Sequence, residues 1–401
     1  MTTVTDLAVG TEEQRVSDLV ARLLDTHPPR STSAATFLGA QYDLGLAWVH
    51  FPEGFGGLGL TPKVQRIIND RIFSAGGPNP YYRNPIGYGM CGPTVVEWGT
   101  PAQKARLRPL FTGEEIWCQL FSEPGAGSDF AGLSSRGARD GDEWLVNGQK
   151  VWTTLAHVAR WGLLVVRTNS EAVKHAGLTA FVVDMHAPGV ETRPLRQMTG
   201  EAEFNEVYFT DVRIPDRERL GNVGDGWRVS LTTLMNERVS IGGAIAPKGS
   251  GPIASAMKLW QDLPADRKDA ATRDELMRLW SEAEINRLTN IRAAQNRKIG
   301  VPGPEGSTGK LAFAELNKKI YDFCVSLMGA DGMLYGDYRM IRPETAMESD
   351  TLQKAFLRSR ANSIEGGTSE VMRNILGERV LGLPGDVRVD RDVPWSQVPR
   401  N

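Results

Sequence analysis

The fold is indicated first by the stretch Gln-Leu-Phe-Ser-Glu-Pro-Gly-Ala-Gly-Ser-Asp, which occupies residues 119–129. Further along the chain comes Val-Asn-Gly-Gln-Lys-Val-Trp-Thr-Thr at residues 146–154, and near the C-terminus Glu-Gly-Gly-Thr-Ser-Glu at residues 365–370. A glycine-rich turn by itself is unspecific, because such turns occur in many loops. Three motifs in this order, spread over most of a 401-residue chain, form a specific signal.

Around the first two motifs the sequence has the pattern of a β domain. From about Ile116 to Arg219, short runs rich in Val, Leu, Phe and Thr are separated by turn residues. The run Trp144–Val146 leads into Asn147-Gly148, which is a strong hairpin signal. Further strands are predicted at Trp161–Arg167, Thr179–Asp184, Val190–Leu195 and Asn205–Val212. We therefore expect a compact β domain of antiparallel character.

Helical periodicity dominates on both sides of this region. Apolar residues recur at spacings of three and four in Glu12–Leu24, in Arg273–Ile299 and in Leu311–Leu327. The sequence thus predicts an α+β protein built from three domains. These are an N-terminal helical domain over residues 1–115, a middle antiparallel β domain over 116–225 and a C-terminal helical bundle over 226–401.

Composition excludes several classes of function. The formal net charge of −2 offers no positive field for nucleic acid. Three widely spaced cysteines, Cys91, Cys118 and Cys324, indicate neither a disulfide framework nor a metal site. We find no signal-peptide pattern and no apolar run long enough to span a membrane. A cytoplasmic protein with no membrane partner is expected.

The three motifs, in their order helical, β, helical, resemble the acyl-CoA dehydrogenases, a family of FAD-dependent flavoproteins. Asn84-Pro85-Ile86-Gly87 and Gly92-Pro93-Thr94 extend the resemblance into the first domain. It implies that the protein removes two hydrogens from an acyl-CoA thioester in β-oxidation-type lipid metabolism, passes electrons to an electron-transfer flavoprotein and forms a homo- or heterotetramer. The segment 364–371 is similar to the actinobacterial branch that includes steroid side-chain-degrading members.

The resemblance implies a carboxylate base, and the sequence offers Glu237 for it. Many family members place the base in a Glu-Gly-Thr run, but here that position is Gly366, and Glu365 stands one residue early. Other members carry the base on a helix of the C-terminal domain, and Leu234-Met235-Asn236-Glu237-Arg238 is similar to that arrangement.

Periodicity supports the same choice, because Glu237 falls on a predicted apolar helical stripe where burial would raise its pKa. The stripe consists of Trp227, Leu231, Leu234, Ile241 and Ala244. The alternative is a structural Glu237 that pairs with Arg238 or Asn236.

The remaining site residues are those implied by the resemblance. Arg238 would steady the substrate or the carboxylate, and the Gly366 N–H would donate to the thioester oxygen, where a missing side chain leaves room for a wide acyl group. Ser128 would touch both the flavin phosphate and the CoA arm. The other cofactor contacts would be Gln119, Phe121, Ser122, Trp152, Thr153, Thr154, Thr368 and Glu370. Each of these residues taken alone is as well explained by ordinary packing or turn formation.

One departure from the family pattern keeps other functions open. The family usually carries an Arg followed by Phe-Gly, which reaches the flavin diphosphate of a neighbouring subunit, but none occurs between Ala254 and Arg278. A second, non-identical subunit could supply that part of the site. The chain could then be a half-site or non-catalytic subunit, or a related flavin oxidase, rather than a complete dehydrogenase. The sequence does not identify the acyl group.

Overall fold

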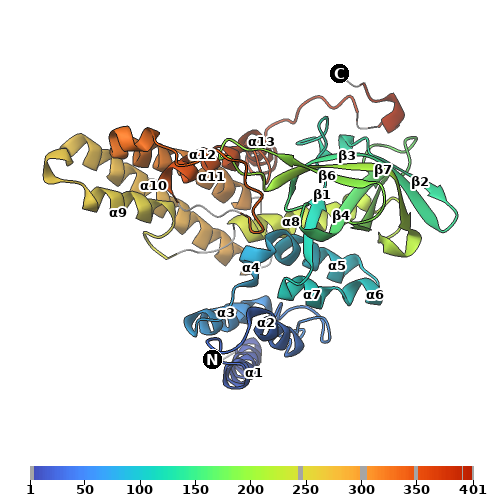
Figure 1. Cartoon of the computed structure of the whole chain (residues 1–401), viewed down its shortest axis with the longest axis horizontal. Helices are drawn as coiled ribbons and strands as arrows, with labels where there is room; N and C mark the ends of the chain where they lie inside the picture. The colour runs from blue at the N-terminus through green and yellow to red at the C-terminus, as the bar shows by residue number, and fades with distance from the viewer. Residues whose placement is uncertain (1–3, 243–246, 299–304, 347–350, 391, 400–401) are drawn as a thin grey trace.

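The computed structural model describes residues 4–242, 247–298, 305–346, 351–390 and 392–399. Helices form the first part of the chain, a sheet forms the middle part, and helices form the last part. In Figure 1 the sheet lies beside the C-terminal helices and above the N-terminal ones. The α+β architecture predicted from the sequence is confirmed. No described helix combines the length and the apolar character that a bilayer-spanning segment needs.

The N-terminal part is a set of helices around an aliphatic core. Val16, Val20 and Leu23 of the first helix are fully buried against Ile68 and Ile72 of the third. The predicted helix at residues 12–24 is confirmed within a longer one. The helices are α1 (Val4–Thr26), α2 (Ala34–Asp43), α3 (Gln65–Ser74), α4 (Pro80–Arg83), α5 (Gly92–Trp98), α6 (Pro101–Lys104) and α7 (Leu107–Thr112), with a π-helical turn at Gly87–Cys91 before α5.

The middle part is an eight-stranded sheet in the order β6-β7-β3-β2-β4-β5-β8, with β1 paired to β4. Its strands are β1 (Ile116–Leu120), β2 (Arg136–Asp140), β3 (Glu143–Thr154), β4 (Ala159–Arg167), β5 (Leu178–Asp184), β6 (Val190–Leu195), β7 (Phe204–Pro215) and β8 (Arg219–Leu220). Most pairs are antiparallel, as expected, but β1 and β2 each pair with β4 in parallel. The predicted antiparallel character thus describes most of the sheet, and the two parallel pairs arise where the chain crosses over between strands.

The predicted hairpin at Asn147-Gly148 is also wrong, since β3 continues through both residues. The Asn147 side chain accepts a hydrogen bond from the Asp211 backbone N–H at 3.0 Å and donates to the Asp211 carboxylate at 2.9 Å. Asp211 has a positive φ of 51°, and the register between β3 and β7 shifts here. Asn147 and Asp211 therefore lie at a β-bulge between β3 and β7, where the Asn-Gly sequence is accommodated without a reversal of the chain.

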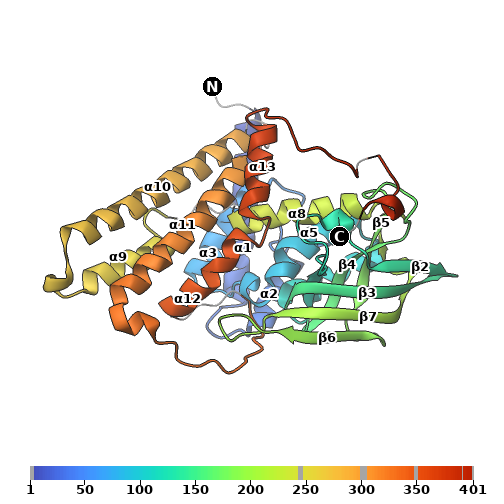
Figure 2. The ribbon, with the colours of Figure 1, turned by 90° about the horizontal axis from the view of Figure 1, so that it is seen from above.

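The C-terminal part is a bundle packed against one end of the sheet. Its helices are α8 (Gly226–Gly242), α9 (Pro252–Asp262), α10 (Ala270–Lys298), α11 (Glu305–Met328), α12 (Leu352–Ser359) and α13 (Ser369–Arg379). The two long predicted helices correspond to α10 and α11. Seen from above, α8 lies between the sheet and the helices α11 and α13, so it faces both (Figure 2).

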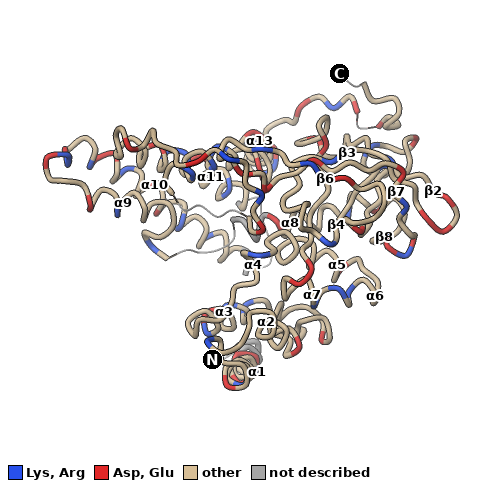
Figure 3. Tube along the Cα trace, in the orientation of Figure 1, with Lys and Arg blue, Asp and Glu red and all other residues tan. Residues whose placement is uncertain are grey.

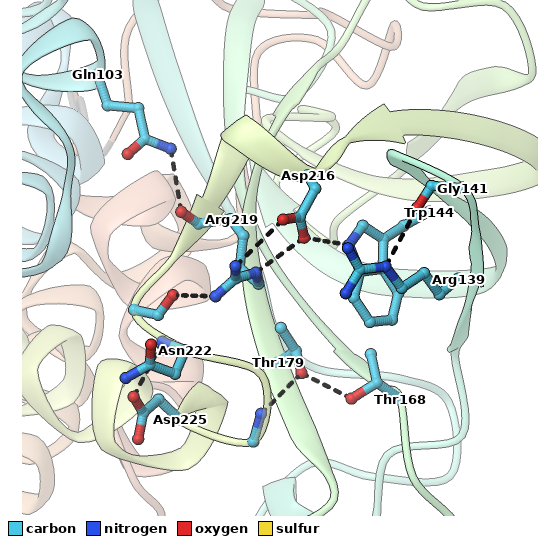
Figure 4. A network of polar contacts seen from close by, with 12 residues as sticks. Gln103, Arg139, Gly141, Trp144, Thr168, Thr179, Asp216, Arg219, Asn222 and Asp225 are labelled. Atoms are coloured by element: carbon cyan, nitrogen blue, oxygen red, sulfur yellow. Dashed lines mark hydrogen bonds and ion pairs between the residues drawn. The ribbon is translucent and has the colours of Figure 1, made fainter.

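A polar network fixes the sheet to the helices at the start of α8 (Figure 4). Asp216 accepts from the Trp144 indole at 2.8 Å and from the Arg219 guanidinium at 3.0 and 3.2 Å. Gln103 of α6 donates to the Arg219 carbonyl, and Arg219 donates to the Gly221 carbonyl at 2.6 Å. The hydrogen bonds from Arg219 and Trp144 lower the pKa of Asp216 to about 2. The junction is therefore held by an ionised carboxylate.

Charged residues are interspersed over all three parts, with acidic and basic segments alternating along the trace (Figure 3). The three cysteines are buried and unpaired. Among the described residues, no group of His, Cys, Asp and Glu is arranged to hold a metal ion.

Candidate active site

A buried ion pair joins the first two sequence motifs. Lys150 of β3 is fully buried and donates to the Glu123 carboxylate at 2.8 Å and to the Phe121 carbonyl at 3.1 Å. Glu123 also accepts from the backbone N–H groups of Ser134 at 2.6 Å and Ser135 at 3.0 Å. Burial opposes its ionisation, but these donors together hold the pKa of Glu123 below its ordinary value. The end of β1 and the end of β3 are thus fixed to each other.

A backbone hydrogen bond completes this connection, because the Val151 N–H donates to the Ser122 carbonyl at 2.9 Å. Directly after it, Trp152 has a positive φ of 60° and leaves 57 % of its surface exposed, although its neighbours Val151 and Thr153 are buried. Within the described chain the buried Thr153 hydroxyl has no hydrogen-bond partner. A strained residue with a bare ring beside an unsatisfied hydroxyl is typical of a ligand-binding edge.

A series of aromatic rings extends from this edge to α8. Phe121 stacks on Phe130 with ring centroids 4.8 Å apart, and Phe130 stacks on Trp227 at 6.1 Å. The His175 ring meets Trp227 edge-on at 4.4 Å. The end of β1 and the residues that follow it, Phe121 and Ser122, are therefore connected through Phe130 to the first turn of α8.

Glu237 lies on the most buried face of α8. Positions 226, 230, 233 and 237 are spaced by four, three and four residues, so they share one side of the helix. Ser230 and Thr233 on this side are fully buried, and the Thr233 hydroxyl is 2.8 Å from that of Thr94 in α5. Glu237 itself is half-buried, because it lies where the packed part of this face ends.

The apolar stripe predicted for α8 is only partly correct. Trp227 and Leu234 pack against the core, but Leu231 is 39 % exposed. The side chain of Ile241 and all of Ala244 lie outside the described residues, as does the side chain of Arg238. The core-facing side instead carries small polar residues that hydrogen-bond within the helix, which a search for apolar periodicity does not detect.

Lys310 of α11 brings Glu237 together with the third sequence motif. Lys310 is 8 % exposed, and its ammonium group donates to the carbonyl of Asn362 at 2.9 Å and to that of Gly367. Burial lowers the pKa of Lys310, while the negative charges of Glu365 and Glu237 act in the opposite direction. The carboxylate of Glu237 and the turn at Gly366-Gly367 are thus both within the electrostatic reach of one buried cation.

The turn itself needs glycine, since Gly366 and Gly367 have φ values of 64° and 88°. The preceding Glu365 is occupied by a two-pronged ion pair with Arg358 at 3.1 and 2.9 Å, and it accepts from Asn362 at 2.9 Å. Arg358 also lies 3.4 Å from Glu203 and over the Phe204 ring. Since Trp152 packs edge-on against Phe204 at 6.0 Å, the turn and the exposed indole belong to one connected cluster.

Helix α13 begins directly after the turn. Thr368 is its N-cap, with a side-chain oxygen that accepts from the Val371 N–H at 3.1 Å. Glu370 is exposed and pairs with Arg373 at 3.2 Å, and Ser128 in the first motif is exposed as well. Ser128 and Glu370 are thus exposed, and Thr368 is partly exposed.

Direct contacts link the end of β1 to the end of β3, and Trp152 through Phe204 and Arg358 to the turn at Gly366-Gly367, whereas Ser128 and Glu370 lie at exposed positions. These contacts also involve residues that sequence reasoning missed. Lys150 and Glu123 were inside the quoted motifs, so their opposite charges were an available signal. Lys310 and Arg358 carried no signal, because only the fold brings them to the turn.

A separate cavity of about 240 Å³ lies between α9, α10 and α11. Trp280, Phe313 and Leu316 line it together with an ion pair in which Arg287 donates to Glu284 at 2.7 and 2.8 Å. None of the predicted site residues lines this cavity.

Comparison with known proteins gives matches along nearly the whole chain. The N-terminal, middle and C-terminal domain models of the acyl-CoA dehydrogenases match residues 11–114, 118–212 and 224–381. The chain is 36 % identical over 350 residues to the acyl-CoA dehydrogenase IpdE1 of Mycobacterium tuberculosis, covering 86 % of each protein. It is 38 % identical over 344 residues to FadE34 of the same organism, covering 85 % of this chain and 45 % of that longer protein.

Solved structures give the same result. The ChsE4–ChsE5 complex from Mycobacterium tuberculosis superposes with a TM-score of 0.70 and 26 % identity, over 94 % of this chain and 98 % of that one. The Tcur3481–Tcur3483 steroid acyl-CoA dehydrogenase shares the fold at a TM-score of 0.70 and 24 % identity, over 94 % of this chain and 98 % of that one. The chain belongs to the acyl-CoA dehydrogenase family.

Proposed function

We propose that this acyl-CoA dehydrogenase is a complete catalytic subunit that oxidises an acyl-CoA thioester to the α,β-enoyl-CoA with FAD, using Glu237 as its base. Membership of the family makes the protein an oxidoreductase acting on acyl-CoA. The observation that supports Glu237 is its half-buried position at the end of the buried face of α8. There its charge acts on Lys310, whose ammonium group donates to the Gly367 carbonyl.

The residues present fit a flavin. A flat ring system with polar edges needs an aromatic contact and unsatisfied hydrogen-bonding groups, and the exposed Trp152 indole and the unpaired Thr153 hydroxyl supply them. Gln119, Ser122 and Thr154 are half-buried at the same edge. Ser128, Thr368 and Glu370 would lie toward the phosphates. When bound, FAD supplies a two-electron acceptor for hydride.

Three residues of this chain would act on the bound acyl-CoA. The Glu237 carboxylate would accept the proton from the carbon next to the thioester carbonyl. Bound FAD would supply the hydride acceptor for the following carbon, and loss of both hydrogens would give the α,β-double bond. The Gly366 N–H donates to the thioester oxygen and so stabilises the negative charge that develops there. Arg238 follows Glu237 in the sequence and would steady the bound thioester.

Glu365 is unsuited to the role of base. Both of its oxygens are engaged by Arg358, and one accepts from Asn362 as well. Both Glu365 oxygens are thus directed at Arg358 and Asn362 rather than at a substrate. Its position supports a structural role in the turn, which leaves the base function to Glu237.

We infer that the active assembly contains a second, related subunit. The connection between α9 and α10 holds a short 3₁₀ turn at Ala265–Arg267 and no Arg-Phe-Gly run for a neighbour's flavin diphosphate. A similar structure is described as a complex of two different chains, ChsE4 and ChsE5. Electrons would leave through an electron-transfer flavoprotein, and the missing side chain at Gly366 favours a bulky acyl group.

Anaerobic titration tests the dehydrogenase activity directly. The purified protein, alone and co-expressed with an encoded homologue, is titrated with straight-chain, branched and steroid side-chain acyl-CoA esters while the flavin absorbance is followed. We expect bleaching by at least one ester. A folded protein that binds no FAD in either form would favour a non-catalytic subunit, and rapid reoxidation of the reduced protein by air would favour an oxidase.

A further inference from the structure

The last residues of the chain return to the loop that carries the first sequence motif. After α13 ends at Arg379, residues 380–390 run without helix or strand toward the sheet, and the short 3₁₀ helix Trp395–Gln397 lies beside the β domain (Figures 1 and 2). The family model for the C-terminal domain ends at residue 381, so this segment lies beyond it. Three contacts join the segment to the β domain: a backbone pairing, a buried tryptophan ring and an ion triad.

The first contact is a backbone pairing. The Trp395 N–H donates to the Ala172 carbonyl and the Ser396 N–H donates to the Ser170 carbonyl, each at 2.9 Å. Pro394 forms a β-bridge with Val173 in the same stretch. Segment 394–396 is thereby aligned with segment 170–173, which connects β4 to β5.

The second contact is the Trp395 side chain, which is 9 % exposed. Its ring lies 4.1 Å from the guanidinium carbon of Arg167, a buried residue at the end of β4. Arg167 donates to the carbonyl of Ala131 at 2.6 Å and to that of Leu133 at 3.2 Å. The indole therefore covers a cation that holds the far end of the glycine-rich loop.

The third contact is an ion triad. Lys174 has a side chain only 10 % exposed and donates to the Asp129 carboxylate at 2.9 Å and to Asp390 of the tail. Burial alone would lower the pKa of Lys174, but the two carboxylates raise it. Asp129 is the last residue of the first motif, directly after Ser128.

We propose that Asp390 and residues 394–396 of the C-terminal tail act as a positioning element for the loop Gly125–Gly132. They fix this loop for binding the phosphates of coenzyme A and FAD, through the contacts of Asp390 with Lys174 and of Trp395 with Arg167. This inference rests on the proposed function, since it assigns phosphate binding to the Ser128 loop. Gly125, Gly127 and Ser128 are exposed, and a glycine-rich loop loses much conformational entropy when it is ordered. A loop that is already held by the tail binds its ligand more tightly.

The test uses the full chain, a truncation after Val387, Trp395→Ala and Lys174→Met. Val387→Ser is the matched control, because this tail residue is 92 % exposed. Coenzyme A, which carries the phosphates and no acyl group, is the binding probe, measured by calorimetry together with FAD dissociation. Hydrogen exchange of peptides covering residues 123–133 reports on the loop itself.

We expect the three tail variants to exchange faster at 123–133 and to bind coenzyme A about tenfold more weakly. Trp395→Phe should retain the wild-type values, since a ring still covers Arg167, and a synthetic peptide of residues 386–399 should restore binding to the truncated protein. Unchanged exchange and affinity in the truncated protein would overturn the inference, as would a loss of binding that the peptide does not reverse.

Failure of the tail inference can be distinguished from failure of the proposed function. Wild-type protein that binds coenzyme A as tightly as its tail variants would reject the positioning role alone. Wild-type protein that binds no coenzyme A would reject the proposed function, and the exchange of the loop would then still decide whether the tail orders it.

Discussion

At the scale of single residues, two buried lysines organise the site. Lys150 connects β3 to the end of β1, and Lys310 connects α11 to the turn beside Glu237. Burying an ammonium group costs free energy that only close partners offset. Both lysines therefore have carbonyl partners, and Lys150 has a carboxylate as well.

Replacing Lys150 should destabilise the protein strongly. In Lys150→Met the Glu123 carboxylate stays buried without its cation, which we expect to lower the free energy of unfolding by about 3–5 kcal/mol. Urea denaturation measures the change, and the exposed Lys63→Met serves as control. A loss below about 1 kcal/mol would show that the backbone donors of Ser134 and Ser135 suffice for Glu123.

Replacing Lys310 should affect catalysis more than binding. In Lys310→Met the carbonyls of Asn362 and Gly367 lose their donor, so the Gly366 N–H is less well aimed at the thioester oxygen. We expect a fall of about 10²-fold in the rate of flavin reduction at saturating acyl-CoA, as for loss of one oxyanion donor. Lys319→Met, on the exposed side of α11, is the control. An unchanged rate would rule out this role.

At the scale of elements, the order of the secondary structure could be predicted and some of the pairing could not. The strands and the long helices follow from local periodicity. The parallel pairing of β1 with β4 joins segments separated by β2 and β3, so no local pattern reports it. Asn147-Gly148 has the right composition for a turn, but the partner Asp211 lies 64 residues away.

The residues of the candidate site also fall into those that could be predicted from the sequence and those that could not. Glu237 and the three motifs could be named from the sequence, because their residue types are specific. The Arg358 and Lys310 partners of the turn could not, since nothing in their neighbourhood distinguishes them from ordinary helix charges.

The turn before α13 offers a prediction at this scale. Gly367 has a positive φ, and an added Cβ would lie 2.7 Å from the Met372 side chain. We expect Gly367→Ala to destabilise the protein by about 1–2 kcal/mol and to slow flavin reduction. Gly377→Ala, inside α13 with an open site for the methyl group, should instead be neutral or stabilising. Equal melting temperatures of the two variants would contradict this account.

At the scale of the whole molecule, the sheet and the helices are joined by the network around Asp216. Its pKa is lowered from 3.8 to about 2, so its ionised form stabilises the folded state above its unfolded pKa. That contribution is lost as the pH falls from about 4 toward 2. We expect Asp216→Asn to reduce the acid dependence of stability in this window. Parallel pH profiles of the wild type and the variant, from urea denaturation, would contradict the assignment.

In the proposed mechanism, one carboxylate on α8 acts on a thioester held at the Gly366-Gly367 turn. The most direct test is anaerobic stopped-flow reduction of the flavin by the preferred acyl-CoA in Glu237→Gln, with Glu365→Gln and the remote, exposed Glu275→Gln as comparisons. We predict a loss of about 10³-fold or more in Glu237→Gln, with reduction retained in both comparison variants. Near wild-type reduction in Glu237→Gln, or its loss in Glu365→Gln alone, would contradict the central claim.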